Sequence, residues 1–566
     1  MFSTPENLFS QGLFASCSES GKLDPMTGKK FYSVLLAVLL AAVLVRVFII
    51  LRNPIPAGDG MASHVLLADN LRQGKGFNTF VKWNLYDTSR EFLRAEANRQ
   101  PAMAFLIMPV FAVFGTGFLQ AQAVALICGI LAILTATFWA RKLFGDQAAL
   151  LTAAFLAFDP PFVWFSTQPD SLMLYITLFY LILMFGGSNT VSWKKSALLG
   201  LMTGLLYLTR TQGALMGPAA GLWVLLGGGR KKWLKALVFS TVTLLVISPW
   251  LIRNMNEFGS PSYSQNGQFL LNENHWSAWS VRETPPSPGD MLQNQGPAAV
   301  AGYVGAGILR VLEPFTTGST HSGEVFGQPT LAVFVVFGMY AMFCRDTGKR
   351  LLFPAIAVVP VMAALVLHQH SGRYMSVAVP LAAAAGSAGI VRVISEPGRR
   401  RMLPWILGLI VLTLAAPFIN ILRQDSRARA SEAMEAAEWI RDNASDSAWV
   451  CTYPNTELYH FIYRKPTLAW PNDYEMLLWP YLYNHGVQYM VVDRDLPVLR
   501  PWLSRCFRRT PDGTAWDVLN PPPFLAEVWR TQSGNTIVYR FTGPVPEGYM
   551  AVDSLPPDNF RAIGPH

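Results

Sequence analysis

Long apolar runs with few charges are the feature of this sequence that most restricts its fold. An apolar helix of about 20 residues crosses the hydrocarbon core of a bilayer, which is about 30 Å thick. The runs at 35–51 and 121–140 are the clearest. Charged residues make up 14% of the chain, whereas a soluble domain has about 25%. The sequence therefore predicts a polytopic α-helical membrane protein.

About eleven transmembrane helices are expected from these runs. They are placed at 32–51, 118–140, 148–164, 171–187, 197–209, 212–228, 234–252, 329–344, 351–367, 374–393 and 402–422. A further apolar helix at 101–115 would be only about 22 Å long. We expect it to be interfacial or re-entrant because it is shorter than the bilayer core.

Six basic clusters provide a test of this topology, because cytoplasmic loops of membrane proteins are rich in Lys and Arg. The clusters are Lys29-Lys30, Arg141-Lys142, Lys194-Lys195, 230–232, 345–350 and 399–401. If 101–115 does not span, all six fall on one side, which is then cytoplasmic. This result also requires 196–228 to cross twice, with a break at 210–213. Arg46 and Arg52, near the end of the first span, are expected to snorkel towards the interface.

The topology divides the chain into three parts. Residues 1–30 form a polar cytoplasmic segment that does not resemble a cleavable signal. Residues 31–424 form the transmembrane domain, with long outer loops at 52–100 and 253–328. Residues 425–566 are expected to form a small extracytoplasmic α/β domain. Its expected elements are a helix at 431–442, strands at 449–453 and 489–492, and a hairpin of 526–530 with 536–541.

Charge and cysteine content exclude some partners and frameworks. The net charge of +9 is explained by cytoplasmic loops, and no basic patch interleaved with aromatic residues indicates a nucleic-acid partner. No CxxC pair occurs among the five cysteines, so no metal or redox framework is indicated. Cys451 and Cys506 share the C-terminal domain, and free thiols are favoured over a disulfide between them.

Ionisable residues collect at the outer ends of the predicted spans, where their cost makes them functional candidates. They are Asp59, Asp170, Arg210, Arg253, His368, His370 and Arg373. Acidic and basic groups on one face of an apolar bundle suggest a site for an anionic ligand. The Arg guanidinium is suited to phosphate, because it forms paired, charge-assisted hydrogen bonds.

Each candidate also has a simpler explanation, and these alternatives stay open. Asp59 follows a span end and could be interfacial, and Asp170 could cap the helix that begins at the next residue. Arg253 and Arg373 could anchor helix ends in lipid headgroups. His368 and His370 have no nearby carboxylate, so a headgroup contact is favoured over metal binding.

Short motifs follow one another in an order that resembles the GT-C superfamily, in particular the protein O-mannosyltransferase-like and aminoarabinose-transferase-like glycosyltransferases of bacterial envelopes. The resemblance covers almost the whole chain. The motifs are Gly58-Asp59-Gly60, 66–71, 74–77, Arg99-Gln100-Pro101, Phe114-Gly115, 140–145, Asp159-Pro160-Pro161 with Asp170, Leu208-Thr209-Arg210, 249–254, Gly372-Arg373-Tyr374, 437–441 and 489–493. Two departures leave the carboxylate pair of the family open. Gly60 stands where mannosyltransferases have a second acid, and Asn98 stands near a family Glu, with Glu96 two residues upstream.

The resemblance implies transfer of a sugar from a polyprenyl-phosphate donor to an acceptor hydroxyl on a lipid, glycan or protein. Asp59 is the implied catalytic base, with Asp170 and Glu96 as further carboxylates. The donor phosphate is then held by arginines and a tyrosine, namely Arg99, Arg210, Arg253, Arg373 and Tyr374. The motifs indicate no certain cofactor, and Asp59 and Asp170 could share a divalent ion such as Mg or Mn.

The implied location is the bacterial inner membrane, with membrane lipids around the bundle. Two other functions are considered beside this one. A secondary transporter should show inverted repeats, and no internal repeat is found in the sequence. A non-catalytic envelope-assembly or lipid-binding protein of the same fold stays open, because fold does not determine function.

Overall fold

The fold is taken from a computed structural model. It describes residues 27–56, 59–83, 94–186, 191–227, 229–264, 288–312, 320–321, 324–325, 329–342, 354, 357–358, 376–396, 398–453, 455–472, 475–493, 496, 500, 503, 506–509, 516–518 and 522–549.

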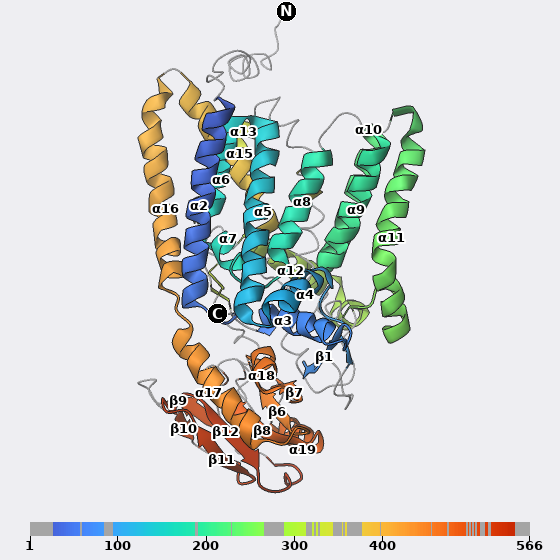
Figure 1. Cartoon of the computed structure of the whole chain (residues 1–566), viewed down its shortest axis with the longest axis vertical. Helices are drawn as coiled ribbons and strands as arrows, with labels where there is room; N and C mark the ends of the chain where they lie inside the picture. The colour runs from blue at the N-terminus through green and yellow to red at the C-terminus, as the bar shows by residue number, and fades with distance from the viewer. Residues whose placement is uncertain are drawn as a thin grey trace, which may run out of the picture.

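Apolar helices lie side by side in a bundle (Figure 1). They are α2 (Gly28–Arg52), α5 (Phe118–Phe144), α6 (Asp146–Phe158), α8 (Leu172–Gly186), α9 (Trp193–Thr209), α10 (Met216–Gly227), α11 (Lys232–Phe258), α13 (Pro329–Met342), α15 (Val379–Ser395) and α16 (Leu403–Arg423). Among the described residues, four helical stretches are long and apolar enough to cross a membrane, and they contain α2, α5, α11 and α16. The chain is thus an integral membrane protein, while the count of eleven crossings stays a prediction.

The helix expected at 148–164 is not continuous, because it stops at Asp159. α6 ends at Phe158, and a short helix, α7 (Pro160–Phe165), follows. The Asp159 carboxylate accepts a hydrogen bond from the Phe162 amide at 3.2 Å and so caps α7. Two prolines come directly after this cap, where the missing N–H groups cost nothing at a helix start but would interrupt a continuing helix.

The break predicted at 210–213 is present. α9 ends at Thr209, a 3₁₀ turn, η2 (Thr211–Leu215), reverses the chain, and α10 runs back (Figure 1). The Gly213 amide donates to the Arg210 carbonyl at 2.8 Å. A Cβ atom at Gly213 would lie 2.5 Å from the Leu206 carbonyl oxygen, so only glycine fits this close approach.

Five of the six basic clusters lie in the described part of the chain, and all five are at the upper end of the bundle in Figure 1. They stand at the start of α2, the end of α5, the start of α9, the start of α11 and before α16. Lys142 donates to the Met184 carbonyl at 2.7 Å, and Arg141 donates to the Tyr32 hydroxyl at 3.2 Å. The sixth cluster, at 345–350, lies outside the described residues.

Arg46 does not snorkel, which corrects the expectation from the sequence. Its side chain is fully buried. It donates to the carbonyls of Ala157 at 2.9 Å and of Leu156 at 3.4 Å. These carbonyls belong to the last turn of α6, where the helix can no longer satisfy them. Arg46 therefore completes the end of α6 from within the bundle.

The lower end of the bundle carries two further helices, α3 (Asp59–Arg72) and α4 (Ala102–Phe114), which pack on each other (Figure 1). A short antiparallel pair, β1 (Asn78–Thr79) with β3 (Arg94–Ala95), follows α3. The remaining elements of the transmembrane part are η3 (Gly229–Lys231), η8 (Arg399–Met402), α12 (Pro288–Leu312), β4 (Thr320–His321) and β5 (Glu324–Val325).

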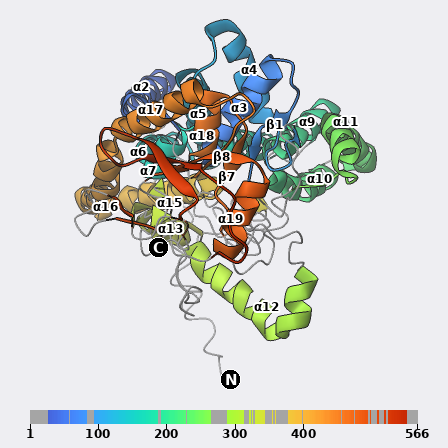
Figure 2. The same ribbon diagram turned by 90° about the horizontal axis from the view of Figure 1, so that it is seen from below.

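Below the bundle, the chain after α16 forms helices around a sheet (Figures 1 and 2). The helices are α17 (Arg427–Asn443), α18 (Thr456–Tyr463) and α19 (Glu475–Asn484). The strands are β6 (Trp449–Thr452), β7 (Thr467–Ala469), β8 (Val487–Val492), β11 (Leu525–Arg530) and β12 (Ile537–Phe541), with a separate pair, β9 (Phe507–Arg509) and β10 (Trp516–Val518). The predicted hairpin is confirmed, since β11 pairs with β12 from Leu525↔Phe541 to Arg530↔Ile537.

One strand of this sheet comes from residues 52–100, the first loop that the sequence places on the outer side. The six-stranded order is β11-β12-β8-β6-β7-β2, and β2 is Val81–Lys82. It pairs in parallel with β7, with Val81 opposite Thr467. The sheet therefore joins the first outer loop to the C-terminal elements.

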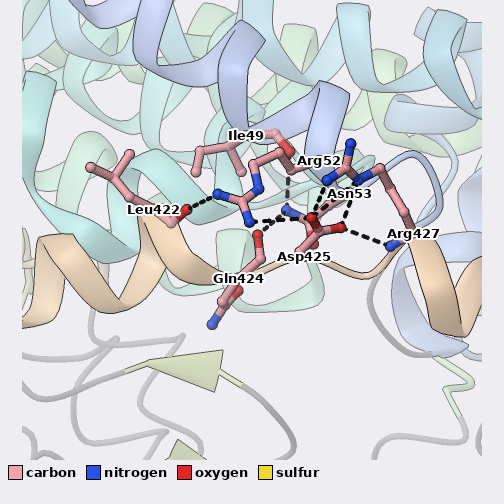
Figure 3. A network of polar contacts seen from close by, with 7 residues as sticks. All are labelled: Ile49, Arg52, Asn53, Leu422, Gln424, Asp425 and Arg427. Carbon is pink, nitrogen blue, oxygen red and sulfur yellow. Dashed lines mark hydrogen bonds and ion pairs between the residues drawn. The ribbon is translucent and has the colours of Figure 1, made fainter.

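A polar junction fixes the point where the C-terminal elements leave the bundle (Figure 3). Arg52, at the end of α2, donates to the Leu422 carbonyl at 2.8 Å and pairs with Asp425 at 3.2 Å. Arg427 contacts the same carboxylate from the other side. The Asn53 side chain donates to the Gln424 carbonyl at 3.4 Å. The linker between α16 and α17 is thus tied to α2.

Candidate functional site

The candidate site lies at the lower end of the bundle, where four separate segments meet. They are α3, the loop from β3 to α4, the start of α8, and the turn between α9 and α10. Each segment brings at least one charged or polar side chain that is mostly buried. Because buried charges in a membrane protein are costly, their convergence needs a specific explanation.

Asp170 and Arg210 form the first part of the site. Arg210 Nη2 lies 2.5 Å from Asp170 Oδ1, and the exposed fractions of these side chains are 12% for Arg210 and 5% for Asp170. Arg210 Nε also donates to the Ser171 hydroxyl at 3.1 Å. Asp170 accepts from the Leu172 amide at 2.6 Å, so it caps α8 as well. The capping role foreseen for Asp170 and its role as a charged partner are both present.

Glu96 and Arg253 form the second part. The Glu96 carboxylate accepts hydrogen bonds from the amides of Asn98 at 2.6 Å and Arg99 at 3.0 Å. Arg253, in α11, donates to the carbonyls of Glu96 at 2.7 Å and Phe77 at 3.1 Å. Its guanidinium lies over the Trp250 ring, 4.7 Å from the centroid. Arg253 therefore ties the first outer loop to the end of α11.

Arg99 is held by one nitrogen only. Its Nε donates to the Ser63 hydroxyl at 3.2 Å. The two terminal nitrogens make no hydrogen bond or ion pair with any residue that the structure describes. The side chain is half-buried. Arg99 thus keeps two parallel terminal donors, and such a pair can bind a phosphate or a carboxylate with two hydrogen bonds.

Ser63 and His64, on α3, connect these parts. The Ser63 hydroxyl donates a short hydrogen bond to Oε1 of Glu457, which lies on α18. His64 is 2% exposed and lies within electrostatic reach of Asp170, Arg99 and Arg210. Burial lowers the pKa of His64 to about 3, so the imidazole is neutral at pH 7. Its Nδ1 has no hydrogen-bond partner within the described part of the chain.

Ser63, His64 and Glu457 were not predicted from the sequence. Ser63 stands one helical turn after Asp59, and this spacing was the available signal for both α3 residues. Glu457 had no signal, because its partner is 394 positions away in the chain.

Several predicted site residues are not placed by the structure. Asp59 is the first residue of α3, but its side chain lies outside the described part. His368, His370, Arg373 and Tyr374 lie outside the described residues altogether. Their proposed roles therefore stay predictions.

The site does not contain a metal-ligand set among the residues that the structure describes. No group of three or more His, Cys, Asp or Glu there could hold an ion. The Asp170 carboxylate already has a cationic partner in Arg210. Cys451 and Cys506 are both buried free thiols.

The family comparison agrees with the resemblance predicted from the motifs. Residues 98–252 match the model of the dolichyl-phosphate-mannose-protein mannosyltransferase family. This segment contains Arg99, Asp170 and Arg210. No curated protein matches the sequence.

Solved structures of two enzymes share the fold. ArnT from Cupriavidus metallidurans bound to undecaprenyl phosphate matches with a TM-score of 0.55 and 14% identity, over 91% of this chain and 98% of that chain. The archaeal oligosaccharyltransferase AglB from Archaeoglobus fulgidus, in complex with an inhibitory peptide and a dolichol-phosphate, matches with a TM-score of 0.53 and 15% identity. That match covers 87% of this chain and 74% of AglB. A second structure of the Archaeoglobus enzyme, in complex with Zn and sulfate, matches with a TM-score of 0.51 and 15% identity, over 85% of this chain and 73% of that chain. The resemblance to GT-C glycosyltransferases is thus confirmed.

Proposed function

We propose that this protein transfers a sugar from a polyprenyl-phosphate donor to an acceptor hydroxyl at the lower end of the bundle. The observation that carries the proposal is the cluster of Arg99, Asp170 and Arg210 around the buried His64 of α3, the helix that begins at Asp59. A bundle that buries such charges at one end suits a donor whose tail stays in lipid while its phosphate meets polar groups.

In the proposed reaction, Asp59 removes the proton from the acceptor hydroxyl, and the resulting oxygen attacks the anomeric carbon. The bond between that carbon and the phosphate oxygen breaks, and the lipid phosphate leaves with the electron pair. A positioned carboxylate base typically contributes about 10²–10⁴-fold. Attack opposite the leaving group would invert the anomeric centre, as the family resemblance leads us to expect.

Arg99 is the described residue best prepared for the donor phosphate, because both of its terminal nitrogens are available. Arg210 already pairs with Asp170, and Arg253 already donates to two carbonyls. We propose that these two arginines supply positive potential, and that Arg373 and Tyr374 complete the phosphate site. Fixed cations that face developing negative charge are often the largest catalytic contribution.

The proposal includes the membrane arrangement. The five basic helix ends at the upper side support a cytoplasmic assignment of that side. The site and the C-terminal elements, residues 425–566, then face the outside of a bacterial inner membrane, below about eleven spans in 31–424. A divalent ion such as Mg or Mn, shared by Asp59 and Asp170, stays part of the proposal, and chelation with EDTA during the assay tests it.

The test is release of free polyprenyl phosphate by the purified protein from a series of polyprenyl-phosphate sugars. We expect release by the wild type and a loss of about 10²–10⁴-fold in Asp59→Asn, because the amide cannot accept the proton. Asp442→Asn is a matched control, since Asp442 is exposed near the end of α17, pairs with its neighbour Arg441 at 2.9 Å and has no proposed role in the site. Wild-type activity in Asp59→Asn would refute its role as the base. Donor binding without release by any donor would favour the non-catalytic lipid-binding alternative.

A further inference from the structure

Glu457 is a buried carboxylate that reaches the candidate site from the C-terminal part of the chain. It is 2% exposed and lies in the first turn of α18. Its Oε1 accepts a hydrogen bond from Ser63, whose oxygen also accepts the hydrogen bond from Arg99 Nε at 3.2 Å. A single hydroxyl thus stands between a carboxylate and a guanidinium.

The direction of these bonds explains why a serine is suited to this position. A hydroxyl has one donor hydrogen and two acceptor lone pairs. Ser63 gives its hydrogen to Glu457, so the oxygen lone pairs are left to face Arg99. In a buried site, hydrogen bonds that share a group polarise each other, and the carboxylate strengthens the hydroxyl as an acceptor. The chain Glu457–Ser63–Arg99 therefore sets the orientation of the Arg99 guanidinium plane.

α18 is held firmly against the first outer loop, so Glu457 has a fixed position relative to α3 (Figure 2). Arg464, at the end of α18, pairs with Asp69 of α3 at 2.9 Å. The His460 ring stacks on Phe80 with a centroid distance of 5.3 Å. The β2–β7 strand pair joins the same two segments. Two of these contacts come from the last turn and the C-terminal end of α18, and the third comes from the strand that follows it.

We infer that Glu457 is a positioning residue for the donor phosphate: through Ser63 it holds Arg99 with its two terminal nitrogens facing the site. The inference rests on the proposed function, in which Arg99 binds that phosphate. The C-terminal elements are then a structural component of the donor site. A guanidinium that is already oriented loses less side-chain entropy when the phosphate binds.

The inference is tested by binding of undecaprenyl phosphate to the full-length protein in detergent, followed by fluorescence or calorimetry. We expect Glu457→Gln and Ser63→Ala each to weaken binding by about tenfold, because the first removes the negative charge of the group that accepts from Ser63 and the second removes the hydroxyl itself. The double variant should bind about as well as the weaker single variant, since both changes interrupt one chain of contacts. Ser63→Thr keeps the hydroxyl and should restore most of the affinity.

Glu438→Gln is the matched control, because Glu438 is exposed on α17 and makes no proposed contact with the site. If Glu457 has only a structural role, Glu457→Gln should lower the midpoint of thermal unfolding and change the donor KM and the acceptor KM equally. The positioning role predicts a higher donor KM, an unchanged acceptor KM and an unchanged midpoint. If Glu457→Gln does not fold, the comparison of Ser63→Ala with Ser63→Thr decides the question.

This binding experiment separates the inference from the proposed function. Wild-type binding without turnover would count against the transferase, while the loss of affinity in Glu457→Gln would still support the positioning role. Turnover by the wild type with unchanged lipid binding in Glu457→Gln and Ser63→Ala would overturn the positioning role alone. No binding by the wild type would overturn both.

Discussion

Asp170 and Arg210 are 40 positions apart in the chain and form an ion pair of 2.5 Å at the lower end of the bundle. The pair joins the start of α8 to the turn after α9, and both side chains are mostly buried. Because Asp170 is already neutralised by Arg210, it is a poor base for an acceptor hydroxyl. This relationship is the reason to assign the base to Asp59 and a supporting charge to Asp170.

The first prediction concerns the stability of this pair. Asp170→Asn should lower the free energy of unfolding by about 3–5 kcal/mol, because it leaves the Arg210 charge buried without its partner. The double variant Asp170→Asn/Arg210→Met should cost less than that, since no unpaired charge remains. A double-mutant cycle of unfolding in detergent measures the coupling. If the losses of stability in Asp170→Asn and in Arg210→Met add up to the loss in the double variant, the two residues are not coupled, which would contradict the buried pair.

The second prediction separates two roles of Arg253. Arg253→Lys keeps the positive charge but removes the planar guanidinium, whose two terminal nitrogens donate to the carbonyls of Glu96 and Phe77. We expect a loss of about 1–3 kcal/mol in the free energy of unfolding, with the donor KM changed less than threefold. Arg253→Met removes the charge as well and should raise the donor KM further. A large rise in the donor KM with Lys, at unchanged stability, would show that Arg253 binds the phosphate directly.

The third prediction is an acid sensitivity that comes from buried histidines. Burial lowers the pKa of His460 to about 4 and that of His64 to about 3, whereas a histidine in the unfolded chain titrates near 6.5. Below about pH 6.5 the unfolded chain therefore binds more protons, and stability falls as the pH falls. The stabilisation is complete above about pH 6.5 and is lost as the pH falls to about 4 for His460 and to about 3 for His64. Each histidine contributes a slope of about 1.4 kcal/mol per pH unit within this window.

His460→Asn provides the measurement of this effect. The His460 imidazole Nδ1 donates to the Lys465 carbonyl at 2.7 Å, and an asparagine amide can provide a similar donor without titrating. The thermal midpoint of the wild type should fall between pH 7 and pH 5, and the variant should show a smaller fall. Equal slopes for the two proteins would exclude His460 as a source of the acid sensitivity.

The bundle was the part of the structure most accessible from the sequence. Four helices begin and end within a few residues of their predicted limits, namely α2, α5, α8 and α16. The reason is that the length of an apolar run in the sequence predicts the length of a membrane helix. The break at 210–213 was also foreseen from local residues. The β11–β12 hairpin follows from a four-residue turn signal between two short strands.

The parts that were missed depend on contacts between distant segments. Nothing near position 81 indicates that β2 pairs with β7, and nothing near Glu457 indicates Ser63. The expectation that Arg46 snorkels fails for the same reason, since the carbonyls that its side chain satisfies belong to α6. Local patterns identified charged residues near the site, but which of them touch each other was decided by tertiary packing.

The last prediction is the topology of the turn between α9 and α10. If 193–227 crosses the membrane twice, a reporter inserted after Gly213 should be extracytoplasmic, and one inserted after Gly229 should be cytoplasmic. A reporter fused after His566 should again be extracytoplasmic, because the C-terminal sheet includes β2 of the first outer loop. A fusion after Arg401, in the basic stretch before α16, is the matched cytoplasmic control. A cytoplasmic signal at both Gly213 and His566 would mean that α9 and α10 do not form two crossings. The strand pairing of β2 with β7 would then require the first outer loop to be cytoplasmic as well, and the proposed donor site would lie on the other face of the membrane.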